Sequence, residues 1–195
     1  GSHPDPIRAA LAALAAGADG ITAHLREDRR HIRDADIGRI MREVDLPLNF
    51  EMAATDEMIA MVLENKPHAA CLVPEKREEV TTEGGLDAAG LHNQLKTPIA
   101  EMSDAGARVS LFIEADERQL EAAKSLGAPV VELHTGTYCE AHEAGDADEV
   151  AKQLARLRKG AEMCEALGIE CHMGHGLSFE TVKPIAAIPQ VMELN

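Results

Sequence analysis

The sequence predicts an α/β protein with the architecture of a (β/α)8 barrel, a TIM barrel. Three observations predict it. The 195 residues, 45% of them apolar, suit one core. Helical and strand-like segments alternate strictly, and polar residues gather where the strands end. Aromatic residues make up only 2% of the chain, so aliphatic and Met side chains must build the core. This composition favours helices and disfavours an all-β fold.

One pattern recurs four times: a helical stretch, a glycine, and an apolar strand that ends in polar residues. The four copies are AAGADGITAH (15–24), DAGARVSLFIE (104–114), SLGAPVVELH (125–134) and ALGIECHMGHG (166–176). Each copy has a glycine where a helix ends and a left-handed φ is needed, namely Gly17, Gly106, Gly127 and Gly168. The repeating unit is therefore a helix followed by a strand.

Three further strands follow the same rhythm without that glycine: LPLNFEM (46–52), AACLVP (69–74) and VMELN (191–195). The predicted helices cover residues 4–16, 36–44, 55–65, 88–104, 116–126, 147–167 and 178–187. Their predicted N-caps include Asp36, Thr55, Asp116 and Ser178. Alternation of this kind, with nearly continuous apolar strands, predicts a parallel sheet covered by helices.

Two parallel architectures satisfy this alternation, an open doubly wound sheet and a barrel. The open sheet usually has a glycine-rich turn after its first strand, and no GxGxxG occurs here. A barrel takes its active-site groups from the ends of several strands, which is the pattern seen. Seven strands are one too few, and an open barrel would leave two unpaired edges. Unless the closure is unusual, residues 1–195 are expected to form one barrel domain truncated at both ends, without the first strand and the last helix. Residues 1–3 are either a tag remnant or native.

The formal charge of −15 comes from 19 basic and 34 acidic residues. This charge should repel nucleic acid and anionic membrane surfaces, so neither is an expected partner. The four cysteines form no CxxC pair, and the sequence resembles neither a signal peptide nor a membrane span. A cytoplasmic protein is predicted, in which any phosphate ligand would need backbone amides or local arginines.

Polar side chains stand at the ends of four predicted strands. They are Thr22 and His24, Asn49 and Glu51, Glu132 and His134, and His172 and His175. Because side chains alternate along a strand, Asn49 shares a face with Glu51 while Leu48, Phe50 and Met52 take the other. A lone Glu51 would be a buried carboxylate satisfied by a hydrogen bond. Repetition of the pattern at one end of the strands favours an active site instead.

The histidines favour acid–base chemistry. His24 and His175 each precede a loop, and histidine titrates near neutral pH. The structural alternative is a hydrogen bond from each ring to a backbone carbonyl. A metal site is a second alternative, with possible ligands His24, Glu51, Glu132, His134, His172 and His175. It is less favoured, because no HxxxH spacing occurs and HMGH (172–175) would place its histidines on opposite faces of a strand.

Three loops carry further candidates. HLREDRRHI (24–32) holds arginines suited to phosphate, although ion pairs with Glu27 and Asp28 would account for at least two of them. EKREEVTTEGGLD (75–87) is either a solvated loop or a lid, with Thr81, Thr82 and a Gly84-Gly85 hinge. In GHG (174–176), glycines on both sides of the histidine would let backbone amides approach a ligand.

Eight segments together carry a family resemblance that runs from about residue 4 to 195. They are HPDPIRAA, GADGITAHLREDRRHI, LNFEMAAT, CLVPEKREEVTTEGGLD, VSLFIEAD, VELHTGTY, GHGL and PIAAIPQVMELN. They resemble the pyridoxine 5′-phosphate synthase family of vitamin B6 biosynthesis. The resemblance implies a barrel enzyme, a transferase that condenses 3-amino-2-oxopropyl phosphate with 1-deoxy-D-xylulose 5-phosphate into pyridoxine 5′-phosphate, phosphate and water. It also implies a homo-octamer with two small phosphorylated substrates and no metal or organic cofactor.

The resemblance implies roles for eight residues. His24 and Glu51 match the proton acceptors, His175 the proton donor, and Glu132 a group that assists charge development. The positions that hold deoxyxylulose phosphate are matched by Arg26, His31 and Thr81, and Gly176 matches a contact to the aminoketone phosphate.

The sequence also departs from the family pattern. Family members begin with a strand NIDH and continue after ELN with IGHA, and His172-Met173 stands where Asn-Ala is usual. Two other functions therefore stay open: a metal-dependent sugar-phosphate aldolase or isomerase, and a non-catalytic remnant that binds sugar phosphates.

Overall fold

A computed structural model describes residues 5–81 and 84–195. Residues 1–3, expected to be a tag remnant or native, and Thr82 of the predicted lid lie outside the described residues. Seven strands form one parallel sheet in chain order. They are β1 (Ile21–His24), β2 (Leu48–Met52), β3 (Ala69–Leu72), β4 (Arg108–Ile113), β5 (Val130–His134), β6 (Glu170–Gly174) and β7 (Val191–Leu194).

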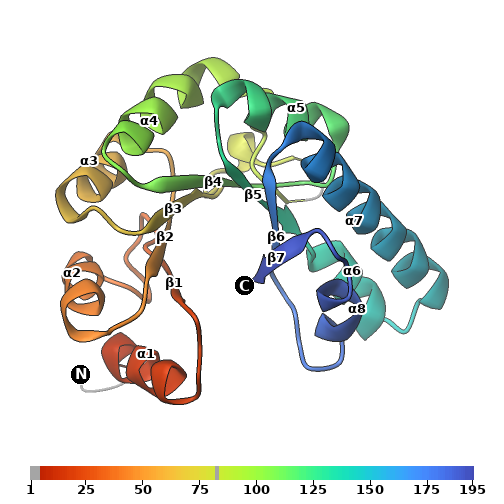
Figure 1. Cartoon of the computed structure of the whole chain (residues 1–195), viewed down its shortest axis with the longest axis horizontal. Helices are drawn as coiled ribbons and strands as arrows, with labels where there is room; N and C mark the ends of the chain where they lie inside the picture. Colours follow the sequence, from red (N-terminus) through yellow and green to blue (C-terminus); the bar gives the residue numbers. More distant parts are fainter. Residues whose placement is uncertain (1–4, 82–83) are drawn as a thin grey trace.

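The helices alternate with these strands. They are α1 (Pro6–Ala15), α2 (Asp34–Glu43), α3 (Asp56–Asn65), α4 (His92–Asp104), α5 (Glu117–Leu126), α6 (Gly136–Glu143), α7 (Ala147–Leu167) and α8 (Val182–Ala186). Figure 1 shows the sheet curled into an arch with the helices on its outer side. Among the described residues, β1 and β7 are the two edges and are not paired with each other. The predicted fold class is confirmed as an incomplete (β/α)8 barrel.

The predicted helix ends are largely confirmed. The four glycines chosen as helix stops have positive φ, from +67° at Gly168 to +96° at Gly106. Thr55 and Asp116 cap α3 and α5, because their side-chain oxygens accept the amide N–H groups of Met58 and Gln119. An additional cap, Asp5, accepts the amide of Ile7 at 3.0 Å.

Two predicted N-caps are wrong. Asp36 lies inside the first turn of α2, where its carboxylate accepts the amide of Arg33 at 3.0 Å. Ser178 precedes a turn instead of a helix, because its hydroxyl accepts the amides of Glu180 and Thr181 and α8 begins only at Val182. In both cases the polar side chain satisfies backbone donors near a helix start without being the boundary residue.

One helix was not predicted. Residues 136–143 (GTYCEAHE) form α6 between β5 and α7. The segment has no helical apolar periodicity, so only its packing identifies it. Tyr138 of α6 is 1% exposed, and its hydroxyl donates to the carbonyl of Thr181 at 3.0 Å. This bond ties α6 to the segment that leads into α8.

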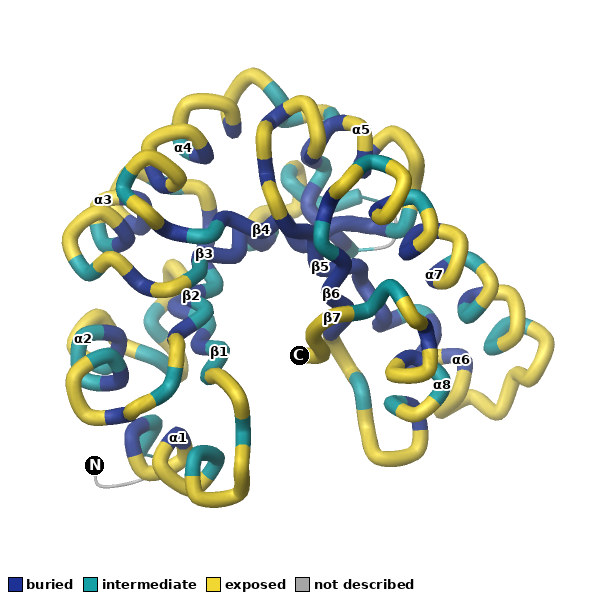
Figure 2. Tube along the Cα trace, viewed as in Figure 1, coloured by how far each residue is buried: buried dark blue, intermediate teal, exposed yellow. Residues whose placement is uncertain are grey.

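The two faces of the sheet differ in chemistry. On β2, Leu48, Phe50 and Met52 are buried toward the helices, whereas Asn49 and Glu51 on the concave face are half-buried, as predicted. The main core therefore lies between sheet and helices, visible in Figure 2 as the buried inner sides of the helices. The concave face holds a small apolar cluster of Cys71, Val73 and Phe112. No helix in residues 5–81 and 84–195 is both long and apolar enough to cross a bilayer.

The outer core should dominate stability. Leu111 of β4 is fully buried in it, so Leu111→Ala should lower the free energy of unfolding by about 2–5 kcal/mol through lost burial and a cavity. The matched control is Leu63→Ala on α3, where the side chain is 37% exposed, and it should change stability by about 0.5 kcal/mol or less. Urea denaturation measures both. Equal losses in the two variants would contradict this assignment of the core.

Candidate active site

The predicted acid–base residues meet on the concave face at the carboxyl ends of the strands. His24 ends β1 and lies beside Glu51 of β2 in the parallel register. The two side chains face each other, with 3.9 Å between His24 Nδ1 and Glu51 Oε2. Glu132 and His134 share the same face of β5, and His175 follows β6 directly. The strand order therefore collects residues that are up to about 150 positions apart in sequence.

Asn195 joins the two glutamates and was missed by sequence reasoning. Its Nδ2 donates to Glu51 Oε1 at 2.9 Å and to Glu132 Oε2 at 3.2 Å. The bridge connects β2 with β5 through the end of β7. A signal existed in the sequence, because Asn195 is a polar residue at the end of an apolar strand, and the other site residues also lie at strand ends.

The two glutamates are unusually hard to ionise. Burial raises the pKa of Glu51, and the charge of His24 and the Asn195 hydrogen bond oppose this rise. Burial and then the nearby Glu51 carboxylate raise the pKa of Glu132 to about 8. Glu132 is therefore mostly protonated at neutral pH. Two carboxyl groups with raised pKa values thus share one hydrogen-bond donor, Asn195.

His134 lies in a cluster of rings at the end of β5. Its ring centroid is 4.9 Å from those of Phe112 and His175. Its Nδ1 accepts the amide N–H of Gly136 at 2.9 Å. Burial lowers the pKa of His134 to about 4, and His175 and Arg156 add to this effect. His134 is therefore neutral at pH 7, with its proton on Nε2.

The backbone around His175 is shaped by its neighbours. His175 itself has a φ of +83°, which is uncommon for a residue with a side chain. The hydroxyl of Thr135 lies 2.6 Å from the carbonyl oxygens of both Gly174 and His175 and can donate to either. At Gly174 a Cβ would lie 2.2 Å from Glu132 Oε1, so a side chain there would displace the Glu132 carboxyl group. This strained strand end presents an exposed His175 next to a buried carboxyl group.

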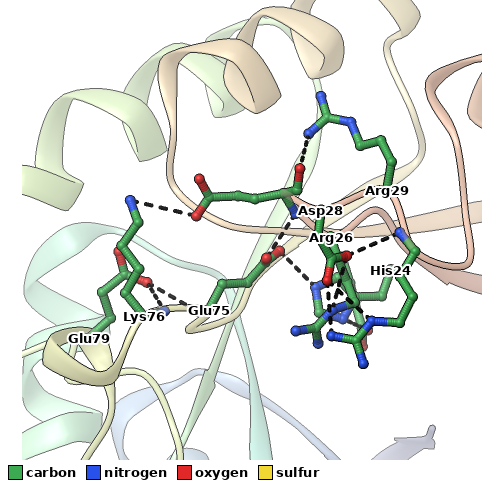
Figure 3. Close-up of polar contacts among 10 residues, drawn as sticks. His24, Arg26, Asp28, Arg29, Glu75, Lys76 and Glu79 are labelled. Atoms are coloured by element: carbon green, nitrogen blue, oxygen red, sulfur yellow. Dashed lines mark hydrogen bonds and ion pairs between the residues drawn. The ribbon is translucent and has the colours of Figure 1, made fainter.

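The arginines of the loop after β1 lie among acidic side chains, and Figure 3 shows Arg26, Asp28 and Arg29 in this loop. Arg30 pairs with Asp28 at 2.9 Å and Arg26 Nε lies 3.6 Å from the same carboxylate, so two arginines have the expected partner, whereas Arg29 pairs with Asp34. The buried Nε of Arg26 has no hydrogen-bond partner among the described residues. His31 is exposed farther along the loop.

The loop after β3 contacts the residues at the ends of β1 and β5. Glu75 reaches His24, with 3.2 Å between Glu75 Oε1 and His24 Nε2. The amide of Thr81 donates to Gly85 O, and the amide of Gly85 donates to Glu114 Oε1 at 3.0 Å. A Cβ at Gly84 would lie 3.0 Å from His134 Nε2, so this glycine allows the loop to rest on the ring. The hydroxyl of Thr81 is buried and, like Arg26 Nε, lacks a hydrogen-bond partner in the described part of the chain.

His172 makes contacts that the other candidates do not share. It pairs in register with Glu132, but its ring bonds Glu170 at 2.8 Å and lies 3.8 Å from Glu193. It lines a hollow of about 680 Å³ between β1 and β7, together with Asn49 and Asn195. Within residues 5–81 and 84–195, no group of three or more His, Cys, Asp or Glu side chains is arranged to hold a metal ion.

Solved structures with the same fold are distant in sequence. A 3-keto-L-gulonate-6-phosphate decarboxylase from Vibrio cholerae aligns with a TM-score of 0.64 and 16% identity, over 97% of this chain and 82% of that one. A HpcH/HpaI aldolase/citrate lyase family protein from Burkholderia cenocepacia aligns with a TM-score of 0.60 and 11% identity, over 96% and 83%. At these identities the likeness supports the fold alone.

Other proteins are much more similar to this chain in sequence than these solved structures are. A pyridoxine 5′-phosphate synthase of Rhodospirillum rubrum is 63% identical over 195 residues, which are 100% of this chain and 77% of the relative. Its counterpart in Jannaschia sp. is 62% identical, over 100% and 79%. The profile of the family described as "Pyridoxal phosphate biosynthesis protein PdxJ" matches residues 1–195. The chain therefore belongs to the PdxJ family of pyridoxal phosphate biosynthesis proteins.

Proposed function

We propose that the cluster at the carboxyl ends of the strands carries out the reaction of a pyridoxine 5′-phosphate synthase, which is what the relatives of this chain are named. The reaction joins 3-amino-2-oxopropyl phosphate to 1-deoxy-D-xylulose 5-phosphate and releases phosphate and water as the pyridine ring closes. The observation that carries the proposal is the convergence of His24, Glu51 and Glu132 from three strands.

The chemistry needs several proton transfers around one pocket. An amine condenses with a ketone, phosphate is eliminated and a ring closes, and each step moves protons between neighbouring atoms. In our proposal His24 and Glu51 accept protons, since burial makes the Glu51 carboxylate a stronger base. Exposed His175 donates protons, and protonated Glu132 donates a hydrogen bond where negative charge develops on an oxygen.

The substrate phosphates have matching groups in the two loops. We propose that Arg26, His31 and Thr81 hold the deoxyxylulose phosphate, and that Gly176 contacts the aminoketone phosphate. The support is that Arg26 Nε and the Thr81 hydroxyl are buried donors with no hydrogen-bond partner among the described residues. A phosphate oxygen would satisfy both. Gly176 is exposed with a φ of +80°, so its backbone is open to a ligand.

Turnover with both phosphorylated substrates tests the proposal directly. In the presence of EDTA the chain should form pyridoxine 5′-phosphate, followed by absorbance, because no metal takes part in the proposed steps. Glu51→Gln should lower kcat by about 10²- to 10⁴-fold, since it removes a base at nearly constant volume. The oxygen of the substituted amide can still accept the Asn195 amide, so the fold should persist.

The control for lost charge is Glu43→Gln on the surface of α2, which should leave kcat unchanged. EDTA-sensitive turnover would support a metal-dependent aldolase or isomerase. A folded chain that binds both substrates without forming product would be a non-catalytic remnant.

The protonation of Glu132 predicts a pH dependence of stability. The folded pKa of about 8 lies above the ordinary 4.5, so the stabilisation by the protonated form is complete below pH 4.5 and is lost as the pH rises toward 8. In urea denaturation from pH 5 to 9, the wild type should lose stability relative to Glu132→Gln. The opposite shift of His134, whose pKa is about 4, cancels in this comparison. Parallel curves for the two proteins would contradict the assignment.

We further propose, from the family resemblance, that the chain works in the cytoplasm as a homo-octamer. Phe179 is 92% exposed and Met192 is 69% exposed, and neighbouring copies would cover such apolar side chains. All four cysteines are buried and free, as a reducing compartment would keep them. Light scattering should give the mass of eight chains. A monomeric mass across a hundredfold range of concentration would contradict the assembly.

A further inference from the structure

Glu75 is a buried carboxylate that the proposed reaction does not use. It follows β3 at the start of the loop that covers the site, and its side chain is only 6% exposed. One oxygen, Oε1, lies 3.2 Å from His24 Nε2, and the other accepts the amide N–H of Glu27 at 2.8 Å. Figure 3 shows it reaching from the loop after β3 to the loop after β1. Carboxylates are rarely buried unless hydrogen bonds or a nearby charge offset the free-energy cost of removing them from water.

The loop around Glu75 is built to hold this position. Glu79 Oε2 accepts the amides of both Glu75 and Lys76, each at 3.1 Å. Lys76 in turn lies 3.6 Å from Glu27. These contacts fix the backbone of Glu75 and connect it to the loop that follows His24. The carboxylate is therefore held against His24 from both loops.

The hydrogen bonds of Glu75 determine which nitrogen of His24 carries the proton. The amide of Glu27 is always a donor, and an ionised carboxylate can only accept. His24 Nε2 must therefore donate to Glu75, so the neutral ring has its lone pair on Nδ1. That nitrogen faces Glu51 at 3.9 Å, too far for a hydrogen bond, and is free to accept a proton.

We propose that Glu75 is a positioning residue that holds His24 in the Nε2–H tautomer, so that Nδ1 is the atom that accepts protons in the active site. The proposal rests on the proposed function, in which His24 is a base. Glu75 does not touch the substrate in this account. It acts through His24, in the way that a buried carboxylate orients the base of a catalytic triad.

Glu75→Gln gives the sharpest test, because it should invert the tautomer. The Glu27 amide can only be satisfied by the oxygen of the new side-chain amide, so the NH₂ group of that amide must face His24 Nε2, which then becomes an acceptor. The proton moves to Nδ1, and kcat should fall by about 10²- to 10⁴-fold, because the base is lost. In a catalytic triad, a histidine held in the wrong tautomer costs about 10⁴-fold. KM for both substrates should change little. Glu75→Asp keeps an acceptor-only carboxylate and should recover part of the turnover.

Nitrogen-15 NMR of the histidine ring reports the tautomer independently of activity. The wild type should show a protonated Nε2 on His24, and Glu75→Gln a protonated Nδ1. Glu78→Gln is the matched control in the same loop, because the Glu78 side chain is exposed, and it should alter neither the tautomer nor kcat. Adding Glu75→Gln to His24→Gln should cause no further loss of kcat.

Two results would overturn the proposal: a wild-type His24 with its proton on Nδ1, or a Glu75→Gln variant with normal kcat and an unchanged tautomer. The wild-type spectrum decides even if Glu75→Gln does not fold. Normal turnover in His24→Gln would instead refute the proposed role of His24, and the ring nitrogens would then decide alone whether Glu75 sets the tautomer.

Discussion

The parallel register of the sheet is the constraint on which the site depends. In a parallel sheet the carboxyl ends of all strands lie at the same end of the sheet. Because side chains alternate along each strand, every second one points to the concave face. His24 lies opposite Glu51 because Ile21 pairs with Leu48, and a slip of β2 by one residue would turn Glu51 toward the helices. The apolar residues on the other face prevent this slip, since Leu48, Phe50 and Met52 are almost fully buried. The core thus fixes the register, and the register fixes the active site.

On the concave face this arrangement lowers the stability of the fold. That face has a small apolar cluster, while two carboxyl groups are buried close enough to influence each other. Asn195 reduces the repulsion by donating to both, and protonation of Glu132 removes most of the rest. Groups that resist ionisation are poor for stability and useful for proton transfer near neutral pH. The inner face therefore holds the candidate site, and the outer face holds the main core.

Much of the fold and part of the site could be predicted from the sequence. Local rules sufficed for the strands, for the glycines at the helix ends and for the caps Thr55 and Asp116, because each depends on neighbours within a few positions. Segment α6 lacks periodicity, so its helix depends on packing that a local pattern does not contain. Asn195 had a local signal, as a polar residue at the end of an apolar strand, but its contacts and those of Glu75 could not be predicted. Their partners lie 144 and 51 positions away in the chain, and only the folded sheet brings them together.

The loop that begins at Glu75 and returns at Gly85 takes part in two of the proposed roles. These roles are the orientation of His24 and the binding of a substrate phosphate. Its first residue contacts His24, while its far end is tied to β4 by the bond from the Gly85 amide to Glu114. Thr81, proposed to hold a substrate phosphate, lies between these two attachments and bonds Gly85 through its backbone. A phosphate that binds Thr81 would therefore act on a segment that is fixed at both ends. With the roles proposed here, substrate binding and orientation of the base depend on one short stretch of chain. A change in the position of that stretch would alter both together, even though neither His24 nor its strand had moved.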